Sequence, residues 1–382
     1  MKIDQRIVCD LNQCAGCMAC LDICPCNAIS IVDRKKNLNA VIDTEKCIQC
    51  NACHSVCQKN HPAGLREPQE WLQGWGDKRT RATSSSGGFG QAVMRAAIQN
   101  GISVATCRFI EGDFKFDLFT NESELTAYIG SKYAKSNPIG IYKKVREKLR
   151  KGEKVLFIGL PCQVSSMRNF TKDHKNLYTI DLICHGTPSI RFLQESMNEY
   201  GKCLSDMREI SFRKKDQYLI RCKPENALLN GIQDCYTRAF LQGLCYTDNC
   251  YSCQYACQKR VGDLTIGDSW GTEMLGELRK GISLILCQTE KGRELLDIVN
   301  FHFFPVDKEN SIKMNRQLKH PTVISKKRNV FFSLINNGIS FNHAVSMIYP
   351  RDFFKQKIKQ IMIECGLYKG MKKYSLCRKD TI

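Results

Sequence analysis

The sequence lacks long apolar runs and is short of acidic residues. Its 382 residues include 57 lysines and arginines but only 38 aspartates and glutamates, which gives a formal net charge of +19. No stretch approaches the ~18 apolar residues of a membrane-spanning helix, and the segment Met1–Arg6 contains no apolar signal region. We therefore expect a cytoplasmic protein with reduced thiols.

Signatures of nucleic-acid binding are also absent from the sequence. A basic surface can attract nucleic acid, an anionic membrane surface or an acidic redox partner. The chain has no helix-turn-helix, zinc-finger or aromatic RNA-binding signature, so we expect no nucleic-acid partner. It also has no Cys-x3-Cys-x2-Cys run, which argues against a radical S-adenosylmethionine enzyme.

Cysteine, by contrast, is abundant, with 23 in the chain. Eight of them form two runs with the same Cys-x2-Cys-x2-Cys-x3-Cys spacing, at a constant offset of 33 residues. The first run is Cys14, Cys17, Cys20 and Cys24, and the second is Cys47, Cys50, Cys53 and Cys57. A duplicated run with this spacing is typical of iron–sulfur segments.

The two runs predict two [4Fe–4S] clusters with crossed ligands. The first three thiolates of a run cover one face of a cubane, and the fourth cysteine ligates the other cluster. One cluster is then bound by Cys14, Cys17, Cys20 and Cys57, and the other by Cys47, Cys50, Cys53 and Cys24. The alternatives are disulfides and structural zinc, but zinc prefers ligands in two pairs. Residues 5–65 resemble a bacterial two-cluster ferredoxin.

Apolar segments followed by loops predict an α/β region after this domain. The apolar runs 155–158 and 177–183 each end in a loop rich in Gly, Pro or Cys, and a predicted helix follows. This βαβ pattern indicates a parallel sheet whose ligands bind at the carboxyl ends of the strands. The loop Ser84–Gly90 precedes another predicted helix, where it acts either as a phosphate-binding loop or as a plain helix cap.

A second set of cysteines lies in the loops of this region. Cys162 and Cys184 follow the two apolar strands, Cys250 and Cys253 form a Cys-x2-Cys turn, and Cys257 is a fifth candidate. Loops that meet at one sheet edge could hold a third [4Fe–4S] cluster. The spacing alone leaves a zinc site, a redox dithiol and unligated thiols open.

Five motifs together resemble the coenzyme F420 hydrogenase/dehydrogenase beta-subunit family over residues 80–305. They are Ser85-Ser86-Gly87-Gly88, Gly130-Ser131-Lys132-Tyr133, Gly159-Leu160-Pro161-Cys162-Gln163, Cys184-His185-Gly186-Thr187-Pro188 and Gly262-Asp263-x4-Gly267-Asp268-x-Trp270-Gly271. With the ferredoxin segment in front, the chain is similar to a bacterial branch of this family that is linked to surface-polysaccharide genes.

The resemblance implies a non-covalently bound FAD and a cluster near it. By this resemblance, the flavin diphosphate lies against two loops, Lys132 supplies positive charge, and His185 is the best proton-transfer candidate or a structural residue beside the cluster. The loop residues are Ser86, Gly87, Gly88, Gly159, Pro161 and Gln163. The flavin-proximal cluster would be ligated by Cys162, Cys184, Cys250 and Cys253.

We therefore expect an α+β ferredoxin-like iron–sulfur domain followed by an α/β flavin-binding module with a mostly parallel sheet. The expected boundaries are 1–65 for the ferredoxin domain, 66–84 for a linker, 85–172 and 173–305 for the two parts of the module, and 306–382 for a basic helical tail. The segment Arg351–Ile382 carries nine lysines and arginines against three acidic residues. We expect an ordinary solvated helix there, with a docking or membrane-surface helix as the alternative.

The expected function is that of an iron–sulfur flavoprotein oxidoreductase. Electrons would pass between the ferredoxin clusters and FAD, with hydride exchange to a deazaflavin or another organic substrate, including a sugar-derived one from a polysaccharide pathway. The expected partners are a soluble electron donor or partner redox enzyme and a small-molecule acceptor. One alternative is an electron-relay subunit without its own substrate site, and a weaker one is a scaffold that keeps its clusters for structure.

Overall fold

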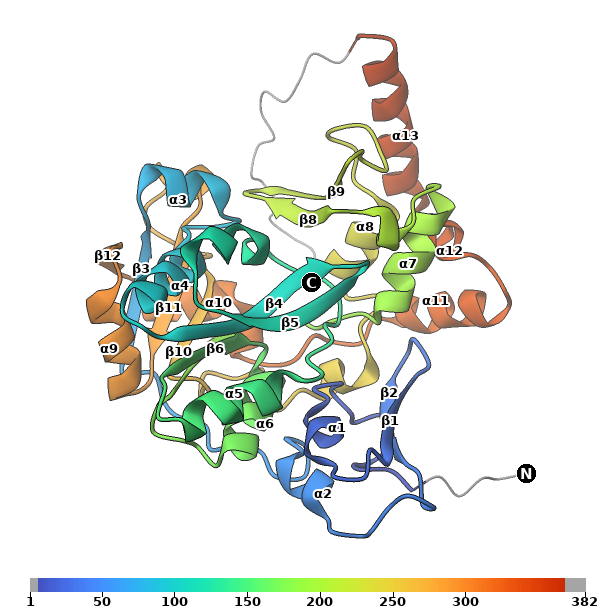
Figure 1. The fold of residues 1–382 in the computed structure, drawn as a ribbon. Coiled ribbons are helices and arrows are strands. Elements are labelled where there is room, and N and C mark those ends of the chain that lie inside the picture. The colour runs from blue at the N-terminus through green and yellow to red at the C-terminus, as the bar shows by residue number, and fades with distance from the viewer. Residues whose placement is uncertain (1–5, 368–382) are drawn as a thin grey trace.

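The computed structural model describes residues 6–367 (Figure 1). Its first part repeats itself as the cysteine spacing predicts. The elements are α1 (Ala19–Ile23), β1 (Ile29–Asp33), β2 (Leu38–Ile42) and α2 (Ala52–Val56). Left-handed backbone recurs at the same offset, with φ of 66° at Gly16 and 58° at Gln49, and of 61° at Met18 and 55° at Asn51. These turns wrap the chain around each group of three cysteines.

The next part is built on an eight-stranded sheet with the order β12-β3-β11-β10-β7-β6-β4-β5. Five strands run in one direction and three in the other, since β5, β11 and β12 pair antiparallel with their neighbours. The strands are β3 (Glu70–Trp75), β4 (Ser103–Ile110), β5 (Asp113–Phe119), β6 (Val155–Gly159), β7 (Leu177–Leu182), β10 (Leu264–Asp268), β11 (Ser283–Cys287) and β12 (His302–Pro305).

Helices cover both faces of this sheet, which is why the central strands are continuously apolar. On one face, α4 (Phe89–Gln99) and α9 (Glu290–Ile298) pack into one hydrophobic core. On the other face, α5 (Ile141–Arg150) and α6 (Pro161–Thr171) share a second core with Cys17, Ala19 and Val56 of the ferredoxin segment. The ferredoxin segment therefore packs directly on the α5–α6 face of the sheet (Figure 1).

A third core lies beyond the carboxyl edge of the sheet. It is formed by helices from two distant parts of the chain and by a β-hairpin. The elements are α7 (Ile190–Glu199), β8 (Glu209–Lys214), β9 (Gln217–Lys223), α8 (Cys235–Leu241), α11 (Lys326–Asn336) and α12 (Phe341–Ile348). The remaining helices are α3 (Lys78–Thr83), α10 (Lys308–Met314) and α13 (Pro350–Glu364). Among the described residues, no helix has the length and apolar character needed to cross a membrane.

Two sequence-based boundaries differ from the structure. Residues 66–84, expected as a linker, contain α3 and the sheet strand β3, and an added Cβ at Gly74 would lie 1.9 Å from the backbone oxygen of His302 on β12. The glycine that suggested a loop is needed for this close approach of two strands. The expected tail beginning at residue 306 includes α11 and α12, whose Phe331 and Phe341 are fully buried. Residues 368–382 of that tail lie outside the described part of the chain.

Candidate functional site: three sets of cysteines and a large cavity

The cysteines form three sets in space, and the first set, which differs from the first run of the sequence, lies at the solvent-exposed end of the ferredoxin segment. Cys47, Cys50 and Cys53 line a cavity together with Cys24 from the other run, as the crossed assignment requires. Cys50 is exposed to solvent. The backbone N–H of Ala28 donates to the Cys24 sulfur at 3.3 Å, a contact that stabilises a thiolate ligand. Cys26 also lines this cavity, although its spacing in the sequence did not single it out.

The second set, Cys14, Cys17, Cys20 and Cys57, is buried. Cys9, which the sequence pattern did not identify, lies beside Cys14 and Cys57, and its single thiol proton can be donated to either sulfur. Hydrogen bonding to Cys9 is the main cause that lowers the pKa of Cys14 to about 7 and that of Cys57 to about 6. Both sulfurs are thereby prepared for the thiolate form that binds iron.

The sheet domain contacts this second set directly. Ser166 on α6 donates from its hydroxyl to the Cys17 sulfur at 3.1 Å, and the hydroxyl of Tyr142 on α5 donates to the Cys17 carbonyl at 2.6 Å. Asp22 accepts from the backbone N–H of Gly140 at 2.8 Å, at the start of α5. The buried cysteines of the ferredoxin segment are therefore held against the sheet domain by specific hydrogen bonds.

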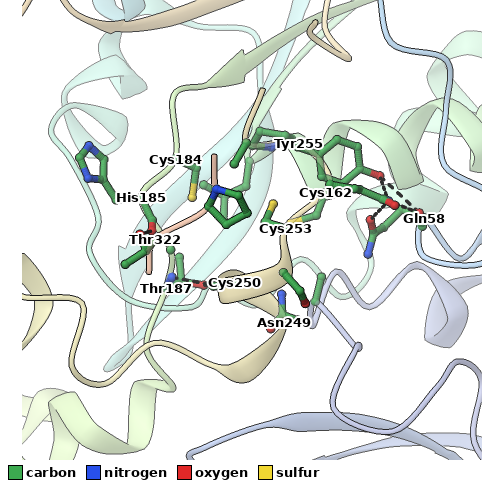
Figure 2. Close-up of a pocket in the computed structure, with 18 of the residues that line it drawn as sticks. Gln58, Cys162, Cys184, His185, Thr187, Asn249, Cys250, Cys253, Tyr255 and Thr322 are labelled. Carbon is green, nitrogen blue, oxygen red and sulfur yellow. Dashed lines mark hydrogen bonds between the residues drawn. The ribbon is translucent and has the colours of Figure 1, made fainter. Parts of the chain in front are cut away.

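The third set lies at the carboxyl edge of the sheet (Figure 2). Cys162, Cys184, Cys250 and Cys253 line one cavity, as the sequence predicted for loops that meet at this edge. Cys162 lies in the first turn of α6 and Cys184 just after β7. The backbone N–H of Thr187 donates to the Cys250 sulfur at 3.5 Å. Cys257 is not among the lining residues, and its thiol donates to the Lys259 carbonyl at 3.2 Å.

The arrangement of donors fits clusters better than single ions. Within residues 6–367, no group of three or more His, Cys, Asp or Glu side chains could hold one metal ion. A single zinc draws its sulfur ligands to about 2.3 Å, whereas four thiolates around a cubane stay apart because iron and sulfide lie between them. Four thiols in each set are the number of ligands that a [4Fe–4S] cluster needs.

A buried lysine lies between the second and third sets. The ammonium of Lys135 donates to the Ala15 carbonyl at 2.9 Å, and the same side chain lines the cavity of the third set. Burial raises the pKa of Cys162, and the positive charge of Lys135 opposes that rise. Lys135 makes no ion pair with any carboxylate in the described part of the chain. A buried ammonium without a carboxylate needs another anion, and a thiolate-ligated cubane is one.

A cavity of about 640 Å³ adjoins the third set, at the carboxyl ends of β6, β7 and β10. Such a volume is within the range of sites that bind cofactors. Among its lining residues are five that the sequence predicted for flavin binding, namely Ser86, Gly88, Lys132, Gly159 and Gln163. The cavity also includes Cys184 and His185, which line the cysteine cavity as well.

Two predicted flavin-loop residues lie elsewhere. Gly87 does not line the large cavity, and an added Cβ there would be 2.2 Å from the Gly74 oxygen and 2.4 Å from the Ser283 nitrogen. This glycine allows the loop to pack against the backbone of β3 and β11. Pro161 begins α6 and lines the cysteine cavity instead. The sequence did not distinguish between a glycine that approaches a ligand and one that approaches a strand.

One end of the large cavity is suited to an anionic ligand. Helix α4 begins there after Gly88, whose φ is 96°, so its N-terminal N–H groups and positive dipole end lie at the cavity. Lys132 donates from its ammonium to the carbonyls of Tyr128 and Ile129, at 2.5 and 3.4 Å. Burial lowers the pKa of Lys132 to about 8, and a bound anion would raise it again by stabilising the ammonium. These residues fit the diphosphate of FAD.

An ion pair in the wall of the large cavity was not anticipated from the sequence. Arg213 on β8 forms an ion pair with Asp268 at the end of β10, and its guanidinium lies over the rings of Tyr218 and Trp270 at 4.9 and 5.5 Å from their centroids. All four side chains line the cavity. The motif Gly267-Asp268-x-Trp270 was the available signal, but its partner on β8 is 55 residues away.

His185 lies between the two cavities. Its ring points away from the cysteines in Figure 2, and it lines the large cavity. Part of His185 is exposed to solvent, but the protein around its ring disfavours the charged form and lowers the pKa, which favours the neutral imidazole. A neutral imidazole can accept or donate a proton, which keeps the predicted proton-transfer role chemically reasonable.

Comparison with known proteins agrees with the resemblance predicted from the motifs. Residues 152–303 match the family model that describes the C-terminal region of the coenzyme F420 hydrogenase/dehydrogenase beta subunit, and residues 13–61 match the 4Fe-4S dicluster domain. Among solved structures, a chain of the F420-reducing [NiFe] hydrogenase complex from Methanosarcina barkeri is similar, with 17% identity and a TM-score of 0.42 over 71% of this chain and 95% of that chain. No curated protein matches this chain.

The chain therefore carries a 4Fe–4S dicluster domain at residues 13–61, ahead of a region, 152–303, that is similar to the C-terminal part of the coenzyme F420 hydrogenase/dehydrogenase beta subunit, and the two matches together indicate an iron–sulfur protein of the oxidoreductase, electron-transfer type.

Proposed function

We propose that this protein is an iron–sulfur flavoenzyme that passes electrons through three [4Fe–4S] clusters to FAD, and from there to an organic substrate. The observation that carries this proposal is the contact between the two cavities. Cys184 and His185 line both the cavity of the third cysteine set and the 640 Å³ cavity. A cluster in the first would adjoin a flavin in the second.

The burial of the cysteine sets supports an order of electron transfer. The set that includes the exposed Cys50 is the entry point for a soluble donor or partner enzyme. The buried set around Cys17 is next, since it contacts α5 and α6. Lys135 connects this set to the third one. FAD, when bound, supplies the change from one-electron to two-electron chemistry and the transfer of hydride.

The chain's own residues then have separate tasks. Lys132 and the start of α4 bind the diphosphate, and His185 holds or moves a proton at its imidazole. The cavity wall around Arg213, Tyr218 and Trp270 orients the second substrate, because its aromatic rings exclude water and its ion pair offers fixed polar groups. A deazaflavin and a sugar-derived compound are both candidates for this substrate.

Quantitation of cofactors in one anaerobic preparation tests the proposal. We expect about four irons and four sulfides for each of three clusters, and one FAD per chain. Turnover of the isolated protein with a small acceptor would then distinguish this enzyme from a relay subunit, which needs its partner. Eight irons without flavin would refute the flavoenzyme.

The role of Lys135 gives a further prediction. In Lys135→Met, we expect the reduction potentials of the second and third clusters to become more negative, because a nearby cation stabilises the extra electron of a reduced cluster. A redox titration followed by electron paramagnetic resonance measures this shift. Lys135→Arg keeps the charge and is expected to restore the potentials.

Lys223→Met is the control, since Lys223 on β9 is an exposed lysine that lines neither cavity. Its potentials should stay close to those of the wild type. Unchanged potentials in Lys135→Met, with all iron retained, would show that this lysine is not placed between two clusters.

A further inference from the structure

Helix α13 (Pro350–Glu364) has one face that holds it to the protein and one that does not. Asp352 pairs with Arg238 of α8 at 3.5 Å, the side-chain oxygen of Gln356 accepts from the backbone N–H of Gln233 at 3.1 Å, and the ammonium of Lys359 donates to the Gly231 carbonyl at 2.7 Å. Residues at positions i, i+4 and i+7 lie on one side of a helix. This polar face attaches α13 to the molecule.

The opposite face of α13 is apolar and exposed. Phe354, Ile358 and Ile361 also follow the i, i+4, i+7 spacing, but are rotated by roughly half a turn from the attached face at about 100° per residue. Their exposed fractions are 63%, 59% and 57%. In Figure 1, α13 extends outward from the region of α8 and α12. A row of large exposed apolar side chains of this kind usually marks a binding surface.

Positive charge flanks the apolar row on both sides. Arg351 and Lys355 lie along one side of it and Lys357 along the other, and all three are exposed. The chain as a whole carries a net charge of +19. Apolar side chains bordered by lysine and arginine are typical of helices that lie in the surface of an anionic membrane, where the cations meet lipid headgroups.

We propose that α13 docks this protein on an anionic lipid surface, with Phe354, Ile358 and Ile361 inserted among the lipids. A second copy of the chain is a poorer occupant of this face, because pairing two such helices would bring their flanking cations together. The attached face keeps α13 fixed while its apolar face points away from the protein. The inference is independent of the proposed flavoenzyme, since none of these residues lines either cavity.

Sedimentation with lipid vesicles tests this docking. We expect the full-length holoprotein to sediment with phosphatidylglycerol vesicles and not with phosphatidylcholine vesicles. Raising the salt from about 0.1 M to about 1 M should release it, since the screening length falls from about 10 Å to about 3 Å. The triple variant Phe354→Ser, Ile358→Ser, Ile361→Ser should bind about tenfold or more weakly, and Lys355→Gln or Lys357→Gln about fivefold more weakly.

The controls are matched by residue type and exposure. Met347→Ser alters an exposed apolar side chain on α12, and Lys46→Gln alters an exposed lysine of the ferredoxin segment; both should bind like the wild type. Equal binding of the wild type and the triple variant would overturn the proposal and assign any membrane contact to another segment. Light scattering that shows a dimer, lost in the triple variant, would overturn it in favour of a second copy.

Discussion

Cys57→Ala is expected to destroy the buried [4Fe–4S] cluster whose other ligands are Cys14, Cys17 and Cys20. Cys57 belongs to the second run in the sequence, yet it lies beside Cys9 together with Cys14 of the first run. Cys24 lines the cavity of the other three cysteines of the second run. With one ligand removed, we expect the iron content to fall by about four per chain.

Thiol alkylation followed by peptide mass spectrometry identifies the affected site. In Cys57→Ala, Cys14, Cys17 and Cys20 should become reactive while Cys47, Cys50 and Cys53 stay protected. Cys24→Ala should give the reverse pattern, and Cys203→Ala, which changes an exposed thiol outside the three sets, should leave the iron content unchanged. Reactivity of Cys47, Cys50 and Cys53 in the Cys57 variant would show that the ligands are not crossed.

Cys184→Ala is expected to remove the third cluster and to separate the ferredoxin clusters from the flavin. Cys184 follows β7 and lines both the cysteine cavity and the large cavity, whereas Cys162 lines only the former. We expect the iron content to fall by about four while FAD is retained. Chemically reduced ferredoxin clusters should then reduce the flavin far more slowly, because the intermediate site is missing.

Stopped-flow absorbance of the flavin, together with iron analysis, measures both effects. Cys257→Ala is the matched control, because Cys257 lies in the same cysteine-rich segment but its thiol points to the Lys259 carbonyl. This control should keep all of its iron and the wild-type rate. If Cys184→Ala kept its full iron content, the third set would not be a cluster site. Loss of iron in Cys257→Ala would show that Cys257 is itself a ligand of a cluster.

Much of the sheet could be predicted because its signals are local. The apolar runs predicted strands over 155–158 and 177–183, and β6 and β7 are found there. Strand β3 was missed, since its sequence Glu-Trp-Leu-Gln-Gly-Trp has a glycine and mixed polarity. Its strand conformation depends on pairing with β11 and β12, more than 200 residues later, and strand propensity is weak against such context.

The sequence by itself predicted the two cysteine sets of the ferredoxin segment, because the ligand spacing of a cluster is imposed by short turns such as those at Gly16 and Gln49. Only the tertiary structure decided which groups the charged side chains of Lys135 and Arg213 contact. Lys135 reaches Ala15 across 120 residues, and Arg213 meets Asp268 across 55. Likewise, a helix was expected after Arg351, but the exposure of its apolar side chains depends on which face is attached to the protein. Contacts of this kind leave no periodic pattern, because packing between distant segments sets them.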